Sequence, residues 1–292
     1  MRGRREGLAV HLLVCFGLGL GPRVAGAQTT SSTGALVRYE LAAAPAQRLE
    51  LPGDLSEVSG LAFTDDDRLF AHGDERAVVW ELQWPSGRAV KRFGIGGRNG
   101  PAMDDFEDIQ VVGERVFLVT STGRVIEGRE GADGENSPVV RATRGLKAGC
   151  EVEGMTWDPG SRSMLLLCKT IESRKWKDHV VVLAVAVETG QFEPEPRIVV
   201  RESDLSRVTG QKRFAGTALV RHPHTGTYLL LSGTQRALAE IDSTGKVLGG
   251  AKLPASRHRQ PEGIAIAPDL TLLISDEGAG HAATISGYAY RR

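Results

Sequence analysis

The chain has 292 residues and no net charge, because 36 Lys and Arg balance 36 Asp and Glu. This balance excludes the broad positive field of a general nucleic-acid-binding protein and the basic surface of a membrane-associated one. With 41% hydrophobic residues and 36 glycines, the chain can bury a substantial core and is rich in turns, which favours strands over long helices.

Residues 1–27 have the three parts of a secretory signal peptide. Basic residues come first, residues 8–20 are apolar, and residues 25–27 form an A-x-A cleavage site. Residues 28–34 are a polar spacer, and no other segment is long and apolar enough to span a membrane. We therefore predict an exported protein, periplasmic or secreted after cleavage, whose residues 35–292 form a single domain without a transmembrane span.

Short segments of alternating polar and apolar residues follow the spacer, each ended by a turn. Residues 36–41 and 47–51 are predicted to be strands. Four further strands, separated by turns rich in Asp, Gly and Pro, are predicted at residues 60–63, 69–72, 78–82 and 88–93. The same order recurs at residues 155–157, 164–168, 180–187 and 198–200. The chain therefore repeats a four-stranded antiparallel unit.

The start of this unit recurs along the whole chain. Aligned positions are Gly60, Asp108, Gly154, Thr217 and Gly263, with spacings of 48, 46, 63 and 46 residues. Four-stranded sheets repeated at this period are the blades of a β-propeller. We predict an all-β fold of five four-stranded antiparallel blades. Six blades are the alternative, because the longest interval contains an insertion, at residues 172–179 or 202–213.

The last unit is one strand short of a complete blade. It supplies predicted strands at residues 263–267, 271–275 and 284–290, and the sequence then ends at Arg292. The N-terminal strand at residues 47–51 is predicted to complete this blade and close the ring.

Two cysteines remain once the signal peptide is set aside. In the predicted hairpin, Cys150 precedes one strand and Cys168 ends its partner, so the two could face each other. An oxidising compartment permits a disulfide between them. Two separate buried thiols are the alternative.

Acidic residues gather at the entrances of the predicted innermost strands. The segment from Asp104 to Asp108 holds four carboxylates in five residues and runs directly into an apolar strand. In a propeller, these entrances and the exits of the second strands lie around one mouth of the central channel. The acidic residues predicted to meet there as metal ligands are Glu57, Asp105, Glu107, Asp108, Glu153, Glu262 and Asp276.

Two interpretations of this acidic mouth stay open. Carboxylates brought together repel one another and raise one another's pKa unless a cation neutralises them. Oxygen ligands without a cluster of Cys or His suit Ca²⁺ better than Zn²⁺, so Ca²⁺ is the predicted cofactor. Alternatively, the acidic side chains bond backbone amides of the next blade and only hold the blades together.

One acid-poor repeat and three histidines add weaker signals. The fourth unit has Phe214 and Gly216 where the other units have acids, so any site at the mouth is lopsided. His72 lies on a strand directed at the mouth, as either a general base or a packed strand residue. His222 and His224 either chelate a metal or belong to an ordinary polar turn on the opposite face.

Several of these motifs resemble those of a known family. Residues 104–109 are similar to the D-[WF]-E-[DG]-I element, and residues 57–61 to the E-x-S-G-L element, of the SdiA-regulated family of exported bacterial β-propellers. Later repeats fit the same pattern, at residues 153–155, 261–264 and 275–277. The architecture is similar to that of calcium-dependent phosphotriesterase, lactonase and phytase-like propellers. The resemblance implies a β-propeller with a cation site at the channel mouth.

Two functions follow from the acidic mouth and the resemblance. The first is an exported Ca²⁺-binding module that recognises a small molecule or a cell-surface partner at the mouth, with no nucleic-acid partner. The second is a Ca²⁺-dependent hydrolase of ester or phosphoester substrates, with His72 and Glu57 as catalytic residues. We expect a monomer in either case.

Overall fold

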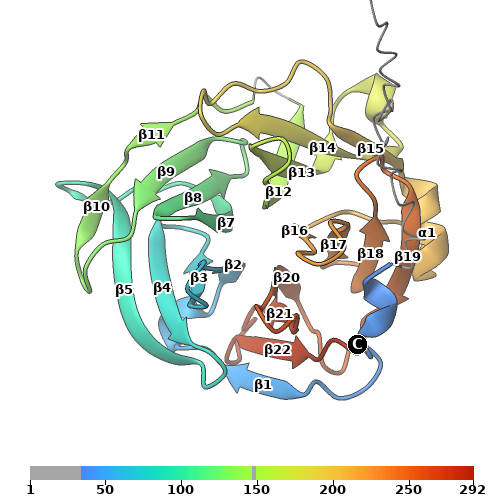
Figure 1. Ribbon diagram of the computed structural model, residues 1–292, viewed down its shortest axis with the longest axis horizontal. Coiled ribbons are helices and arrows are strands. Elements are labelled where there is room, and N and C mark those ends of the chain that lie inside the picture. The colour runs from blue at the N-terminus through green and yellow to red at the C-terminus, as the bar shows by residue number, and fades with distance from the viewer. Residues whose placement is uncertain (1–33, 147–148) are drawn as a thin grey trace, which may run out of the picture. The chain divides into compact units, whose positions relative to one another are not determined.

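The computed structural model describes residues 34–146 and 149–292, which form a β-propeller of five blades (Figure 1). The predicted signal peptide and nearly all of the polar spacer lie outside the described residues. Each blade has four strands in an antiparallel meander, and the first blade adds two short strands at its edge. No helix in the described part of the chain is long and apolar enough to cross a membrane.

The strands of the first four blades follow one another outward from the channel. Blade 1 contains β2 (Val58–Phe63), β3 (Leu69–Gly73), β4 (Val78–Gln83) and β5 (Arg88–Gly97), with β6 (Gly100–Pro101) and β10 (Asn136–Pro138) at the edge. Blade 2 contains β7 (Phe106–Val112), β8 (Arg115–Thr120), β9 (Val125–Arg129) and β11 (Arg141–Ala142). Blade 3 contains β12 (Cys150–Asp158), β13 (Ser163–Ile171), β14 (His179–Ala186) and β15 (Ile198–Arg201). Blade 4 contains β16 (Ala218–Arg221), β17 (Tyr228–Ser232), β18 (Ala237–Ile241) and β19 (Val247–Lys252).

Blade 5 combines strands from both ends of the described chain. It contains β20 (Pro261–Ile266), β21 (Leu272–Asp276), β22 (Thr284–Tyr288) and, outermost, β1 (Gln47–Glu50). β1 pairs antiparallel with β22, with Gln47 opposite Gly287, and η2 (Gly53–Leu55) then leads into blade 1. The innermost strands contact one another in the order β2, β7, β12, β16 and β20, and β20 contacts β2 (Figure 1). The predicted closure by an N-terminal strand is confirmed.

The hydrophobic core lies between the blades. Each of the five buried clusters draws its residues from two neighbouring blades, such as the cluster of Phe70, Phe93 and Phe106 between blades 1 and 2. Strand β17 is buried at every position because neighbouring blades cover both faces of its sheet. A blade alone would leave both of these faces in water, so the blades stabilise one another.

The long interval between the starts of blades 3 and 4, which the structure describes throughout, contains helical turns and no sixth blade. Helix α1 (Glu202–Thr209) follows β15 directly and contacts β18 and β19, with Leu205 fully buried. It ends at Gly210, whose φ of 67° is readily adopted by a residue without a Cβ. The 3₁₀ turn η3 (Arg174–Trp176) fills the other predicted insertion.

The prediction of a strand at residues 36–41 is wrong, because this segment begins with the 3₁₀ turn η1 (Leu36–Arg38). The buried carboxylate of Glu240 accepts hydrogen bonds from the N–H groups of Ala35 and Leu36, both at 2.7 Å. Leu36 and Tyr39 then both enter the cluster between blades 4 and 5. Leu36 and Tyr39 are three residues apart, which is also the repeat of a 3₁₀ turn.

Candidate ligand-binding site at the acidic mouth

The innermost strands carry β-bulges where they enter their sheets. In blade 2, Phe106 pairs with Thr120 and Asp108 with Val119, which leaves Glu107 without a partner. Blades 1, 3 and 5 have an irregularity at the same place, and the unpaired residues there include Ser59, Glu153 and Glu262. A bulge changes the direction of the side chain on its extra residue. The repeated acidic motif therefore coincides with a repeated bulge.

The residue after the bulge is glycine in three blades because another blade approaches it closely. A Cβ on Gly60 would lie 2.9 Å from the backbone nitrogen of Ile109 in blade 2. A Cβ on Gly154 would lie 2.8 Å from the backbone nitrogen of Leu219 in blade 4. The glycines permit close packing of the inner strands, while the residues before them lie on the bulges.

Lys169, which sequence reasoning missed, lies among the glutamates of these bulges. Its Nζ is 2.8 Å from Glu153 Oε1 and 3.7 Å from Glu151 Oε1. Its charge also acts on Glu107 and Glu262, which come from two other blades. We call Glu107, Glu153, Glu262 and Lys169 the acidic ring.

Further carboxylates surround the acidic ring. Like-charge interactions connect the ring directly to Asp105, Glu151, Asp276 and Glu277, and Glu277 in turn to Glu57 and Asp74. We call the ring together with five of these acids the acidic mouth: Glu57, Asp74, Asp105, Glu151 and Glu277. One lysine thus faces a surplus of carboxyl groups. These acids come from blades 1, 2, 3 and 5. That the predicted acids meet at one place as metal ligands stays a prediction.

Burial and like charge keep protons on the acidic ring. Burial, with Glu153 and Asp105 adding to it, raises the pKa of Glu107 to about 9. Burial, followed by Glu277 and Glu153, raises the pKa of Glu262 to about 8. Burial also raises the pKa of Glu153, against the opposing effect of its hydrogen bond with Lys169. Without a bound cation, Glu107 and Glu262 are mostly protonated at neutral pH, and a cation bound beside them would displace these protons and leave carboxylates.

Asp108 bonds to the protein backbone and not to the other acids. Its carboxylate accepts hydrogen bonds from the N–H of Ile109 at 2.8 Å and from the N–H of Met155 in blade 3 at 2.7 Å. Burial raises the pKa of the Asp108 carboxyl group well above its usual value. This is the geometry of the alternative interpretation, in which an acid connects two blades.

Asp276 is also bonded within the protein. Its Oδ2 lies 2.8 Å from His258 Nδ1, and its Oδ1 accepts a hydrogen bond from the N–H of Gln260 at 3.3 Å. His258 Nε2 lies 2.6 Å from the hydroxyl of Tyr288, and all three side chains are buried. Sequence reasoning missed this His-Asp-Tyr group, because nothing in the spacing shows that the loop before β20 folds back onto β21 and β22.

Glu57 and Asp105 are exposed at the edge of the acidic mouth. Glu57 lines a pocket of ≈ 350 Å³, together with Asp74, Trp80 and Arg92 of blade 1. This pocket includes two carboxylates of the acidic mouth and an aromatic group in its wall.

The predicted metal ligands do not form a metal site as they stand. Within residues 34–146 and 149–292, no three His, Cys, Asp or Glu side chains converge closely enough to hold a metal ion. At Glu153, the ammonium group of Lys169 supplies the positive charge. The Ca²⁺ site therefore stays a prediction, and the residues present fit it poorly.

His72 is completely buried, away from the surface of the mouth. Its Nδ1 lies 2.8 Å from the carbonyl oxygen of Gly73, so Nδ1 carries the proton, and Nε2 is left as an acceptor without a partner among the described residues. Burial lowers the pKa of His72 to about 4. This placement fits the packed strand histidine better than a general base that must reach a substrate.

His222 and His224 lie in the turn between β16 and β17, and only His222 is buried. The Nδ1 of His222 accepts hydrogen bonds from the N–H of His224 at 3.3 Å and of Thr225 at 3.2 Å, and its Nε2 lies 3.1 Å from the Tyr39 hydroxyl. Nδ1 thus stabilises the turn, and Nε2 joins it to Tyr39, which follows η1. His224 lines a separate pocket of ≈ 750 Å³ with Ile266, at the other end of β20 from the acidic ring.

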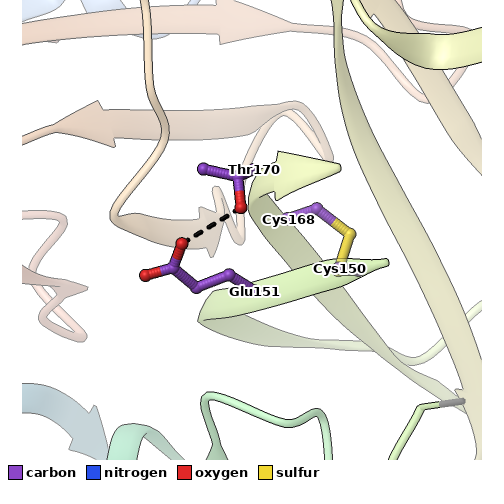
Figure 2. The surroundings of a disulfide bond; sticks show 4 residues. All are labelled: Cys150, Glu151, Cys168 and Thr170. Carbon is purple, nitrogen blue, oxygen red and sulfur yellow. Dashed lines mark hydrogen bonds between the residues drawn. A yellow bond between two sulfur atoms is a disulfide. The ribbon is translucent and has the colours of Figure 1, made fainter. Parts of the chain in front are cut away.

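A disulfide joins Cys150 and Cys168 across the hairpin of β12 and β13, with Cα atoms 5.5 Å apart. Figure 2 shows it beside the hydrogen bond of 3.0 Å that Thr170 Oγ1 donates to Glu151. Because Glu151 and Lys169 directly follow the two cysteines, the disulfide lies at the edge of the acidic mouth.

Comparison with known proteins identifies a family and a shared fold. The family described as SdiA-regulated matches the chain over residues 36–279. No curated protein matches the sequence.

Two solved structures of similar fold have low sequence identity to this chain. Glutaminyl cyclase from Myxococcus xanthus is 13% identical with a TM-score of 0.56, over 85% of this chain and 95% of that one. The PQQ-bound aldose sugar dehydrogenase from Streptomyces coelicolor is 11% identical with a TM-score of 0.51, over 85% of this chain and 99% of that one. At such identities the likeness concerns the fold alone.

Proposed function

The chain belongs to the SdiA-regulated family, and from that premise we propose that it is a ligand-binding β-propeller that takes a cationic ligand at its acidic mouth. The acidic ring is the observation that carries the proposal. Three bulge glutamates from three blades interact electrostatically there with one lysine and with further carboxyl groups. Such a surplus of carboxyl groups over lysine favours a cation that displaces the protons of Glu107 and Glu262, either a metal ion such as Ca²⁺ or an organic ammonium group.

Partial burial strengthens the attraction for a cation. Charges exposed to bulk water are screened over about 8 Å at physiological ionic strength, whereas partly buried charges are screened much less. Glu107 and Glu262 are partly buried, and both are already under repulsion from neighbouring carboxylates. A bound cation would relieve that repulsion.

We also propose that the protein acts outside the cytoplasm. The disulfide between Cys150 and Cys168 supports this location, because cytoplasmic proteins are kept reduced. Cell fractionation, with gel mobility compared before and after reduction, tests it. Recovery of the protein in the cytoplasm with both thiols reduced would contradict the proposal.

Calorimetric titration tests the cation site directly. CaCl₂ and spermidine are titrated separately into purified, chelator-treated protein, and we expect heat of binding from at least one of them. Glu107→Gln should weaken that binding, because it removes a carboxylate from the acidic ring. Glu114→Gln is the matched control, since the Glu114 side chain is 87% exposed and lies outside the acidic mouth. Absence of binding by both probes would overturn the proposal.

A Ca²⁺-dependent hydrolase is the second candidate, and the pocket beside Glu57 favours it. This carboxylate lines a cavity of ≈ 350 Å³ and is exposed, whereas His72 is buried. Glu57 could therefore orient a water molecule against a bound ester. A panel of ester and phosphoester substrates, with and without Ca²⁺, tests this function. Turnover that Glu57→Gln abolishes would support it, and no turnover across the panel would eliminate it.

A further inference from the structure

Lys169 and Glu153 both lie outside the regular pairing of their hairpin. The pairing of β13 skips Lys169, and the pairing of β12 skips Glu153. The corresponding hairpins of blades 1, 2 and 5 each have one register shift, whereas this one has two. Two opposed bulges thus bring the extra residue of each strand together, and their side chains meet at 2.8 Å.

The residues on both sides of Lys169 are bonded to β12. Cys168 precedes it and forms the disulfide with Cys150 (Figure 2). Thr170 follows it and donates a hydrogen bond of 3.0 Å to the Glu151 carboxylate. The bulge at Lys169 therefore cannot straighten into the regular ladder without breaking these bonds, and its side chain stays at the acidic ring.

We infer that Lys169 is a tethered cation that determines which ligands the acidic ring accepts, an inference that rests on the proposed function. Ca²⁺ needs about six to eight oxygen ligands. The carboxylate of Glu153 is already paired with the ammonium group of Lys169, so it is not free to be one of them. The same positive charge repels a divalent ion more strongly than a singly charged group. Glu107 and Glu262 make no side-chain hydrogen bond within the described residues, so they can bond an ammonium group that displaces their protons.

The ligand class that follows is an organic amine, and free Ca²⁺ is excluded while Lys169 is in place. An alkylammonium group donates hydrogen bonds to carboxylates one at a time and does not require a closed shell of oxygens. The bond between Lys169 and Glu153 is itself an example of such a contact in this ring.

Titrations with two probes and matched variants test the inference. CaCl₂ and spermidine are titrated separately into the chelator-treated wild type, Lys169→Met and Lys169→Arg. We expect the wild type to bind spermidine in preference to Ca²⁺, and Lys169→Met to bind Ca²⁺ about tenfold or more tightly than the wild type. Lys169→Arg restores the charge and should again exclude Ca²⁺. The control is Lys175→Met, which removes an exposed lysine paired with Glu195 in the same blade.

A second variant tests the role of the disulfide. Cys150→Ser combined with Cys168→Ser releases the bulge but keeps Lys169, so we expect a Ca²⁺ affinity between those of the wild type and Lys169→Met. Circular dichroism and the thermal transition show whether each variant is folded. This variant also provides a test of the inference if Lys169→Met does not fold.

The outcomes separate the inference from the proposed function. Equal Ca²⁺ affinity in the wild type, Lys169→Met and the serine variant overturns the inference, and the proposed function still stands if spermidine or Ca²⁺ binds the wild type. If no protein binds either probe, both fail. If Ca²⁺ binds Lys169→Met alone, Lys169 does exclude Ca²⁺, but the amine ligand and the proposed function of the wild type both fail.

Discussion

The carboxylate of Asp108 accepts a hydrogen bond of 2.7 Å from the backbone N–H of Met155, so blade 2 is bonded to blade 3 through a buried side chain. The same carboxylate accepts the N–H of Ile109 at 2.8 Å. Asp108→Ala would leave two N–H groups without this acceptor. We expect the free energy of unfolding to fall by about 2–5 kcal/mol.

Urea denaturation at neutral pH measures this loss. Asp105→Ala is the matched control, because Asp105 is an exposed acid in the same segment and its removal should change stability by less than about 0.5 kcal/mol. An equal, small effect of both substitutions would show that Asp108 does not stabilise the contact between the blades.

Glu107 gives the stability of the protein a pH dependence on the alkaline side. Its pKa is raised to about 9 in the folded protein, mainly by burial, whereas a glutamate in an unfolded chain titrates near 4.3, its approximate reference value. Between these two pKa values the folded state binds more protons than the unfolded state, so the free energy of unfolding falls as pH rises. We expect the wild type to lose stability relative to Glu107→Gln between about pH 6 and pH 8.5.

Denaturation curves at the two pH values measure this difference. Comparison with Glu107→Gln cancels the contributions of other titrating groups, and Glu114→Gln, at an exposed glutamate, should follow the wild type. A constant difference between the wild type and Glu107→Gln over this range would contradict a raised pKa.

The blades could be predicted because their signals are local. Alternation, turn composition and a fixed period each depend on residues close in sequence, and they place β2, β3 and β4 within one or two residues of their observed bounds. The prediction of a strand at residues 36–41 failed because the structure there depends on a distant group. The carboxylate of Glu240 accepts hydrogen bonds from the start of η1.

The roles of the individual acids could not be predicted. Glu107 and Asp108 are neighbours in the sequence, yet the bulge leaves only the first unpaired, while the second bonds Met155. Lys169 was missed for the same reason, because it reaches Glu153 only through the shifted register of β12 and β13. A bulge depends on pairing between strands, and a composition pattern does not show it.

His222 makes stability depend on pH on the acidic side. Burial, followed by the charges of His224 and Arg221, lowers its pKa to about 4 in the folded protein, whereas an unfolded histidine titrates near its reference value of about 6.5. Between these values the unfolded state binds more protons, so the free energy of unfolding falls as pH falls. Protonation would also prevent Nδ1 from accepting the N–H groups of its own turn.

We therefore expect His222→Asn, whose side-chain oxygen can accept the same N–H groups, to lose less stability than the wild type between about pH 6.5 and pH 4.5. Denaturation at both pH values measures the change. His281→Gln, at an exposed histidine, should follow the wild type. If His222→Asn and the wild type lose equal stability on acidification, then His222 does not stay neutral in the fold.

Gly154 tests whether the repeated glycine is required by close packing of the blades. A Cβ at this position would lie 2.8 Å from the backbone nitrogen of Leu219, and backbone atoms of an inner strand have little freedom to move. Gly154→Ala is therefore expected to lower the free energy of unfolding by about 2 kcal/mol or more. The matched control is Gly249→Ala in β19, where no atom lies within 4 Å of the added Cβ. That substitution should be neutral or stabilise the protein by up to about 1 kcal/mol, since alanine restricts the unfolded chain. Thermal and urea denaturation of both variants measure their stabilities. Equal stabilities would contradict the prediction, because they would mean that blades 3 and 4 can separate enough to accept a side chain.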